Sequence, residues 1–147
     1  MDNILISIKP KYAARIIEGK KRVEIRRRRM NVRKGDRLWI YSSCPLASIE
    51  AVAIVDSVVW GDPLEIWPCV SGLADISEET YSRYLAGSSS ACAIYLGDVV
   101  RLTSPLSLKE IRRGNPGFHP PQFFQRIPDS SPLLKMLCGA CVQGQRE

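Results

Sequence analysis

Residues 19–26 read Gly-Lys-Lys-Arg-Val-Glu-Ile-Arg, and this segment carries the clearest structural pattern of the chain. Its second half alternates apolar and charged residues, and a period of two predicts a β-strand. Glu24 and Arg26 therefore share one face of that strand. Gly19 suits the end of a preceding helix, because glycine readily adopts the left-handed conformation found there. The stretch predicts a helix, a tight turn that carries Lys21, and a strand.

Outward from this stretch, short strands and helices follow one another without strict alternation, which argues against a doubly wound parallel sheet. β-Branched or alternating runs predict strands at residues 3–8, 22–28, 37–42, 49–59, 91–96, 99–103 and 122–127. Helical spacing predicts helices at residues 11–18, at 64–70 and from Ser77 onward, with a short helical turn at 107–112. A Gly-Asp turn at 97–98 is expected to join two strands as a hairpin. We expect an α+β fold: a small mixed, mostly antiparallel β-barrel with two or three helices flanking its mouth.

The length of 147 residues and the apolar content of 45% fit one domain with a real core. We expect this domain to span residues 1–127 and a loosely ordered C-terminal tail to follow at 128–147, where three leucines are the main pattern. No apolar run approaches the ~20 residues that cross a bilayer. The first residues lack the basic flank and apolar stretch of a signal peptide. A cytoplasmic protein without membrane contact is therefore expected.

Positive charge is concentrated in one segment of the chain. Residues 9–37 hold thirteen Lys and Arg against three acids, a local charge of +10, whereas the rest holds eight basic and twelve acidic residues. A concentrated positive charge binds phosphates with release of counterions. A basic run is often only a solvated face, but its confinement to a fifth of the chain favours a polyanion partner. RNA or another single-stranded nucleic acid is the expected partner, with a nucleoside as a further alternative.

Several separated motifs resemble those of the ASCH domain family, which belongs to the PUA-like superfamily of small β-barrels. They are Ser7-Ile8-Lys9-Pro10-Lys11-Tyr12, the Gly-x-Lys and Glu-x-Arg motifs within residues 16–26, Ile40-Tyr41-Ser42-Ser43, the segments 91–94 and 97–99, and Pro120-Pro121-Gln122-Phe123-Phe124. The resemblance covers residues 3–127. It is specific because the motifs occur in the right order, although any one alone would be weak. It implies a PUA-like barrel and RNA binding.

The expected site is a basic cleft around the Gly-x-Lys-x-x-Glu-x-Arg segment. The ammonium of Lys21 can reach a phosphate or a base edge, and a carboxylate beside a guanidinium is held ionised and oriented. The alternative for Glu24 and Arg26 is a structural salt bridge inside the barrel mouth. Tyr41 is expected either to stack on a base or to lie in the core. The expected nucleic-acid-binding residues are Lys9, Lys11, Lys21, Glu24, Arg26, Arg28, Tyr41, Ser42, Ser43 and Gln122.

Two hydrolase activities are alternatives to simple binding, with Lys21 and Glu24 as the catalytic residues. The segment resembles that of ASCH-like amidohydrolases that deacylate acetylated cytidine, which use this lysine, a threonine three residues on and a distant glutamate. Here Glu24 occupies the threonine position, and a carboxylate does not replace a hydroxyl nucleophile. Glu65 is the nearest candidate for the distant acid. Other ASCH proteins are ribonucleases, for which Lys21, Tyr41 and Ser42 are the candidate groups. A DNA-binding regulator has less support, because no helix-turn-helix pattern is visible.

The five cysteines and the single histidine indicate no metal centre, and we expect no cofactor. An odd number of cysteines at scattered spacing argues against a disulfide framework. Cys138 and Cys141 form a Cys-x-x-Cys pair, but zinc prefers four ligands and no second pair accompanies them. We interpret the pair as incidental thiols. His119 lies in a proline-rich loop without an obvious partner, which favours neither a catalytic nor a ligand role.

Overall fold

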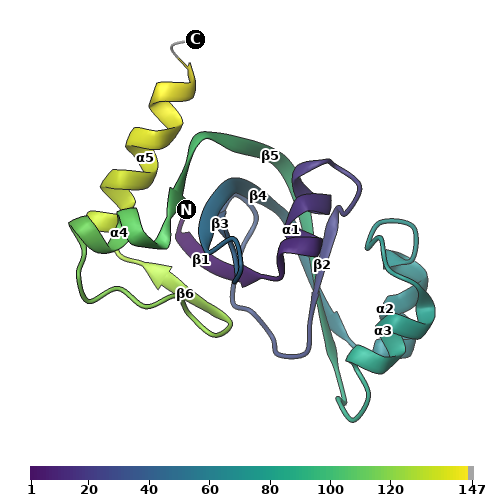
Figure 1. The fold of residues 1–147 in the computed structure, drawn as a ribbon. Coiled ribbons are helices and arrows are strands. Elements are labelled where there is room, and N and C mark those ends of the chain that lie inside the picture. The colour runs from purple at the N-terminus through teal and green to yellow at the C-terminus, as the bar shows by residue number, and fades with distance from the viewer. Residues whose placement is uncertain (146–147) are drawn as a thin grey trace.

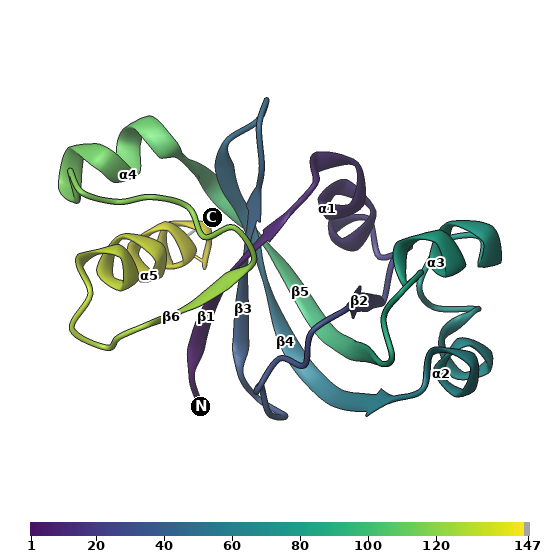
Figure 2. The same ribbon diagram turned by 90° about the horizontal axis from the view of Figure 1, so that it is seen from below.

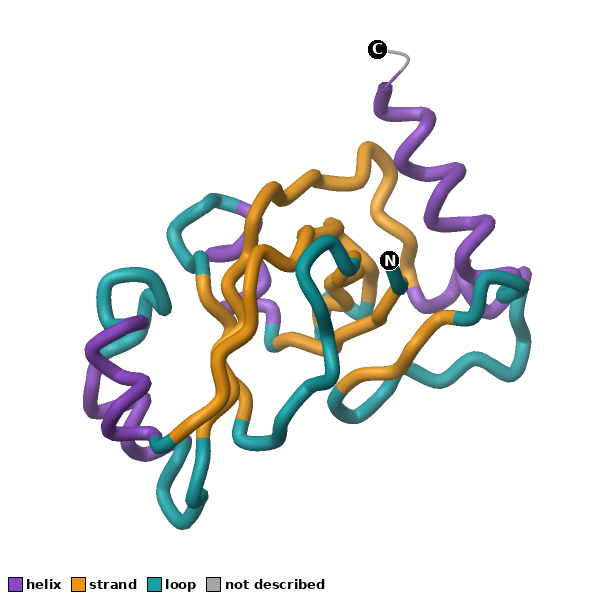
Figure 3. The backbone as a smooth tube through the Cα atoms, turned by 180° about the vertical axis from the view of Figure 1, so that it is seen from behind, coloured by secondary structure: helices purple, strands orange, loops and turns teal. Residues whose placement is uncertain are grey.

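Six strands form one curled sheet in the computed structural model, which describes residues 1–145 (Figures 1 and 3). The strands are β1 (Asn3–Ile8), β2 (Val23–Arg26), β3 (Arg37–Ser42), β4 (Ser48–Gly61), β5 (Ala91–Ser107) and β6 (Phe124–Ile127). They lie in the order β2-β5-β4-β3-β1-β6. β1 and β3 pair in parallel, and the other neighbours pair antiparallel. The expected α+β, PUA-like fold is confirmed, in the form of a half-barrel.

The described residues form five helices, and most of them gather at the two ends of the sheet. They are α1 (Pro10–Ile17), α2 (Pro63–Val70), α3 (Glu78–Tyr84), α4 (Leu108–Gly114) and α5 (Pro132–Gln145). Helices α2 and α3 lie together beside β2, whereas α4 and α5 lie at the opposite end near β6 (Figures 1 and 2). No helix in residues 1–145 is long and apolar enough to cross a membrane. We call the end where α1, β2 and α3 meet the mouth of the half-barrel.

Alternation along the central strands divides most of the core into two clusters. Ile4 and Ile6 of β1 and Ile40 of β3 lie in the inner cluster, inside the curl of the sheet. The intervening Leu5 and Trp39 lie in an outer cluster that α4 and α5 cover. Successive side chains of a strand point to opposite faces, so a sheet covered on both sides needs apolar residues at nearly every position. This explains the continuous apolar runs of β1 and β3.

The segment expected to be a hairpin at residues 91–103 is instead part of one long strand, and the predicted Gly-Asp turn is wrong. β5 runs unbroken through Gly97 and pairs with β4 along most of its length. The pairing shifts register between Ala53 and Val55 and again between Val55 and Ser57. A β-bulge bends a strand without ending it. A side-chain carbon at position 97 would lie 3.3 Å from the backbone oxygen of Ile54, so glycine allows a close approach of strands here.

The C-terminal segment is more ordered than the sequence led us to expect. Residues 132–145 form α5, in which Leu133, Leu137 and Ala140 are buried in the outer cluster. Their spacing of four and three residues places them on one face of the helix. Glycine and proline dilute this period in the sequence, so the leucines alone do not predict the helix. The segment at 128–147 thus contains a helix over residues 132–145, and residues 146–147 lie outside the described part.

Candidate functional site

A left-handed glycine turns the chain from α1 into β2. Gly19 has a φ of +82°, as expected for the residue that follows a helix end. The backbone N–H groups of Lys20 and Lys21 both donate to the carbonyl oxygen of Arg15, each at 3.0 Å. This tight connection brings Lys21 back over the end of the helix. Its side chain therefore enters the mouth instead of pointing into solvent, and only 3% of the residue is exposed.

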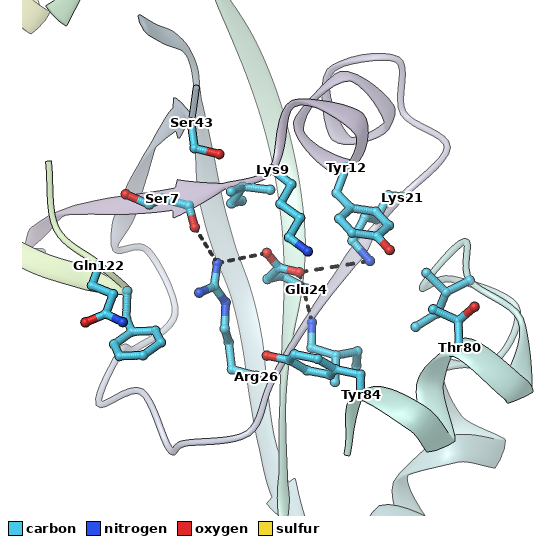
Figure 4. A pocket seen from close by; sticks show the side chains of 14 residues that line it. Ser7, Lys9, Tyr12, Lys21, Glu24, Arg26, Ser43, Thr80, Tyr84 and Gln122 are labelled. Carbon is cyan, nitrogen blue, oxygen red and sulfur yellow. Dashed lines mark hydrogen bonds and ion pairs between the residues drawn. The ribbon is translucent and has the colours of Figure 1, made fainter. Parts of the chain in front are cut away.

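The buried ammonium of Lys21 contacts three different groups, of which Glu24 and Tyr12 are drawn in Figure 4. Its Nζ donates to the carbonyl oxygen of Ala74 at 2.8 Å. It also lies 4.0 Å from Oε1 of Glu24 and 5.4 Å from the ring centroid of Tyr12. Burial lowers the pKa of Lys21 from its ordinary value of 10.5, although the carboxylates of Glu24 and Asp75 act in the opposite direction. The side chain is thus a cation with little water around it, fixed at one place.

Glu24 and Arg26 form an ion pair beside this lysine. The carboxylate Oε2 of Glu24 accepts from Nη2 of Arg26 at 3.1 Å, and the same nitrogen donates to the carbonyl oxygen of Ser7 at 3.0 Å. Both residues oppose inner-cluster side chains of β5, since Glu24 pairs with Ile94 and Arg26 with Cys92. The strand therefore turns its charged face towards the inside of the half-barrel, and Glu24 is only 7% exposed.

A cavity of about 400 Å³ opens over these charged groups. It is lined by Ser7, Ile8, Lys9, Tyr12, Lys21, Glu24, Ile25, Arg26, Ser43, Ile76, Thr80, Tyr84, Gln122 and Phe123. The floor is charged and buried, and much of the wall is aromatic or aliphatic (Figure 4). A volume of this size and a few converging polar groups on a largely apolar wall are typical of small-ligand sites. We call this space the first cavity.

Two aromatic side chains at the edge of the first cavity remain accessible. Tyr84 of α3 is 42% exposed, and Phe123, just before β6, is 47% exposed. The guanidinium carbon of Arg28 lies 5.4 Å from the centroid of the Phe123 ring. α3 is held in place by Tyr81, whose hydroxyl donates to the carbonyl oxygen of Pro63 at 2.7 Å. An accessible aromatic face beside a charged floor suits a flat polar ligand.

The structure brings most of the predicted binding residues together at this cavity, but not all of them. The predicted residues that line it are Lys9, Lys21, Glu24, Arg26, Ser43 and Gln122. Lys11 lines a neighbouring cavity, and Arg28 lies at the edge over Phe123. Tyr41 lies in the outer cluster at 4% exposure, and Ser42 is buried outside the lining. The alternation of β3 turns Tyr41 to the same side as Trp39, so stacking on a ligand in this cavity is not available to it.

Tyr12, Thr80, Tyr84 and Phe123 belong to the cavity but were not among the predicted site residues. Tyr12 and Tyr84 occur at helical spacing with apolar neighbours in the sequence, and an aromatic residue on such a face is normally part of the core. Their approach to the mouth depends on how α1 and α3 dock on the sheet. Phe123 had a local signal, since it adjoins Gln122 in the Pro-Pro-Gln motif.

The other candidate chemical groups lie away from the first cavity. Glu65 in the first turn of α2 and His119 in the proline-rich loop are both exposed and absent from the lining. Cys138 and Cys141 lie on α5 at the opposite end. Within the described residues, no group of three or more His, Cys, Asp or Glu side chains is arranged to hold a metal ion.

The curled mixed sheet and its charged mouth define a PUA-like β-barrel protein. Residues 6–114 match the family model of the ASCH domain. A Zymomonas mobilis protein named ASCH domain-containing ribonuclease is 34% identical over 118 residues, which make up 80% of this chain and 79% of that protein. The chain therefore belongs to the ASCH domain family.

Solved structures agree with this assignment. The crystal structure of ASCH from Zymomonas mobilis has a TM-score of 0.85 and 30% identity, and the match covers 93% of this chain and 94% of that one. An NMR structure of a Rhodopseudomonas palustris protein has a TM-score of 0.62 and 14% identity, with 97% and 94% covered. At that identity the second likeness shows the fold alone.

Proposed function

We propose that this chain binds single-stranded RNA by taking one unstacked base into the first cavity. The observation that carries the proposal is the trio of Lys21, Glu24 and Arg26 on the floor of an open cavity, with Lys21 and Glu24 almost fully buried. Burying charged groups is costly, and a purely structural ion pair gains nothing from an adjacent empty space. The kinship with a protein named a ribonuclease supports RNA as the ligand.

The floor presents the donors and acceptors that the edge of a base requires. The carboxylate of Glu24 accepts hydrogen bonds from ring N–H or amino groups, whereas Lys21 and Arg26 donate to ring nitrogens or carbonyl oxygens. Specific RNA recognition commonly takes splayed bases of single strands, with hydrogen bonds to their edges and stacking on aromatic rings. The accessible rings of Tyr84 and Phe123 at the cavity edge provide stacking surfaces.

Cleavage of the bound RNA is the second candidate function, because of the ribonuclease name of the Zymomonas mobilis relative. Cleavage by the 2′-hydroxyl of RNA requires a base that removes the hydroxyl proton and an acid that protonates the leaving 5′-oxygen. An amine with a lowered pKa serves such proton transfers better than an ordinary lysine. Burial lowers the pKa of Lys21, and the neighbouring Glu24 supplies a carboxylate. Lys21 and Glu24 are therefore the catalytic candidates.

The acetylcytidine deacylase alternative has less support. Glu24 occupies the place of the hydroxyl nucleophile, and its carboxylate is engaged with Arg26 at 3.1 Å. Glu65, the candidate distant acid, is exposed on α2 outside the cavity lining. Within the described residues, the first cavity therefore contains the lysine used by the deacylases, but it has neither a hydroxyl nucleophile at position 24 nor the distant glutamate.

A titration of labelled single-stranded RNA, followed by product analysis on a gel, tests binding and cleavage together. Arg26→Gln removes a charged donor of the floor, and we expect it to weaken binding about tenfold, or ~1.4 kcal/mol. The matched control is Arg113→Gln, which removes an exposed arginine of α4 and should leave the affinity nearly unchanged. Equal affinities of the two variants, or no binding by the wild-type chain, would contradict the proposal. RNA fragments that Lys21→Met fails to produce would support the ribonuclease candidate.

A further inference from the structure

A second cavity of about 490 Å³ adjoins the first cavity at the mouth. Tyr12, Ile76 and Thr80 line both, so the two spaces share one wall. In Figure 4, Tyr12 and Thr80 stand at the side of the first cavity on which Lys21 lies. A ligand in the first cavity therefore lies directly beside the second, across this shared wall.

The second cavity has a different chemical character from the first. Its lining includes the basic side chains of Lys11, Arg15 and Lys20 and one carboxylate, that of Asp75. Ser71, Ser77 and Thr80 add hydroxyl groups, so it is a polar and positively charged space, in contrast to the largely apolar wall of the first cavity. Cations and hydroxyl donors are the groups with which proteins contact phosphate oxygens.

Two of the three cations are available to a ligand. Arg15 donates from Nη1 to Oδ2 of Asp75 at 2.8 Å, which neutralises both. Lys11 is exposed, and its Nζ lies 5.6 Å from the ring centroid of Tyr12, beside the shared wall. Lys20 lies 3.3 Å from Oε2 of Glu18, and both of these side chains are at least half exposed. Such an exposed pair is weak enough for a phosphate to replace the carboxylate.

We infer that the second cavity receives a backbone phosphate adjacent to the base held in the first cavity, with Lys11 and Lys20 as the residues that bind it. The inference rests on the proposed RNA-binding function and deepens it. It implies a ligand that carries a phosphate next to its base, as a polynucleotide does and a free nucleoside does not. A base and its neighbouring phosphate are separated by one sugar, and the two spaces are separated by one shared wall, formed by Tyr12, Ile76 and Thr80. The phosphate then fixes the register of the strand, while the first cavity reads the base.

The test compares a short single-stranded RNA with the four free nucleosides in binding titrations at several salt concentrations. The double variant Lys11→Glu/Lys20→Glu should weaken RNA binding at least tenfold. It should also make the plot of log affinity against log salt shallower by about 0.7 for each phosphate that the protein no longer neutralises. Lys109→Glu/Lys135→Glu, which reverses two exposed lysines on α4 and α5, is the control with the same change of net charge. Glu18→Gln removes the competing carboxylate and should strengthen binding about twofold.

The outcomes separate this inference from the proposed function. Suppose that the wild-type chain binds RNA, that Arg26→Gln weakens this binding, and that the two double variants lose equal affinity. The second cavity is then not a phosphate site, although the first cavity still binds a base. Free nucleosides that bind as tightly as the RNA would also overturn the inference alone. If the RNA does not bind to the wild-type chain at all, the proposed function itself fails. Circular dichroism spectra that match the wild type establish that each variant is folded.

Discussion

At the end covered by α4 and α5, the sheet buries Leu133 and Leu137, whereas at the mouth it buries Lys21 and Glu24. The same curled sheet thus has one end closed by apolar packing and one end where charges face a cavity. Apolar burial stabilises a fold directly, but a buried ion pair is at best a weak contribution. The α4–α5 end is therefore expected to contribute most to stability, and the buried charges at the mouth support the proposal that it binds a ligand.

Truncating the apolar end should have the largest effect on stability. Leu137 is fully buried in the outer cluster, so Leu137→Ala should lower the free energy of unfolding by about 3 kcal/mol through reduced burial and a cavity. Urea unfolding measures this change. RNA affinity of the folded variant should stay near that of the wild type, because α5 lies at the end opposite the mouth.

Lys135→Ala is the control for this variant, since Lys135 is exposed on the same helix. Its change in unfolding free energy should be within about 0.5 kcal/mol. A Leu137→Ala protein as stable as the control would mean that α5 does not close the core. A folded Leu137→Ala protein that loses RNA affinity would mean that the two ends are not independent.

Substitution of glycine by alanine should lower the stability of the fold at position 19, near the mouth, and raise it at position 139, on α5. Gly19 has a φ of +82° and free space around it, so Gly19→Ala is limited by backbone strain and should cost about 1 kcal/mol. Gly139 lies inside α5 with open space around it, and Gly139→Ala should stabilise the fold by up to about 1 kcal/mol through helix propensity. Thermal unfolding of both variants, monitored by circular dichroism, gives the sign.

Gly19→Ala should also weaken RNA binding, because Gly19 sets the turn that brings Lys21 into the mouth. Gly139→Ala should leave binding unchanged. If both glycine variants shift stability in the same direction, the left-handed conformation at position 19 does not require glycine. If Gly19→Ala is destabilised but binds RNA normally, the position of Lys21 does not depend on that turn.

The sequence predicted most of the sheet and the local part of the site. The alternation around Glu24 and Arg26 predicted that they share a face, and the structure pairs them at 3.1 Å. It also placed Gly19 at the end of α1. These features depend on neighbours in the chain, and a period of two or a glycine after a helix is sufficient to predict them.

The features of the site that the sequence did not predict depend on contacts between distant parts of the chain. Lys21 was expected on the rim of a turn, but its ammonium reaches the carbonyl oxygen of Ala74, 53 positions away, and is buried. Tyr84 comes to the mouth because α3 docks there, and no local pattern encodes that docking. Tyr41 illustrates the opposite case, because the phase of alternation in β3 already turns it towards the outer cluster with Trp39.

The smallest expected effect is on the pH dependence of stability. Burial lowers the pKa of Lys21 in the folded chain below its ordinary value of 10.5, so the unfolded chain binds more protons between those two values. The cost of burying this ammonium is fully present below the lowered pKa and is relieved as the pH rises towards 10.5. Lys21 therefore contributes a gain of stability with rising pH in that window.

Lys21→Met removes this contribution, so its stability should rise less, or fall more, than that of the wild type as the pH approaches 10.5. Burial raises the pKa of Tyr41, Tyr81, Tyr84 and Tyr95, which lowers stability in the alkaline range, but both proteins carry these tyrosines and the difference between them cancels that effect. Urea unfolding at a series of alkaline pH values measures the difference. Lys135→Met, at an exposed lysine of α5, should follow the wild-type curve. Parallel plots of unfolding free energy against pH for Lys21→Met and the wild type would show that the Lys21 charge is no less stable at the mouth than in water. That result would remove the energetic contrast between the mouth and the α4–α5 end.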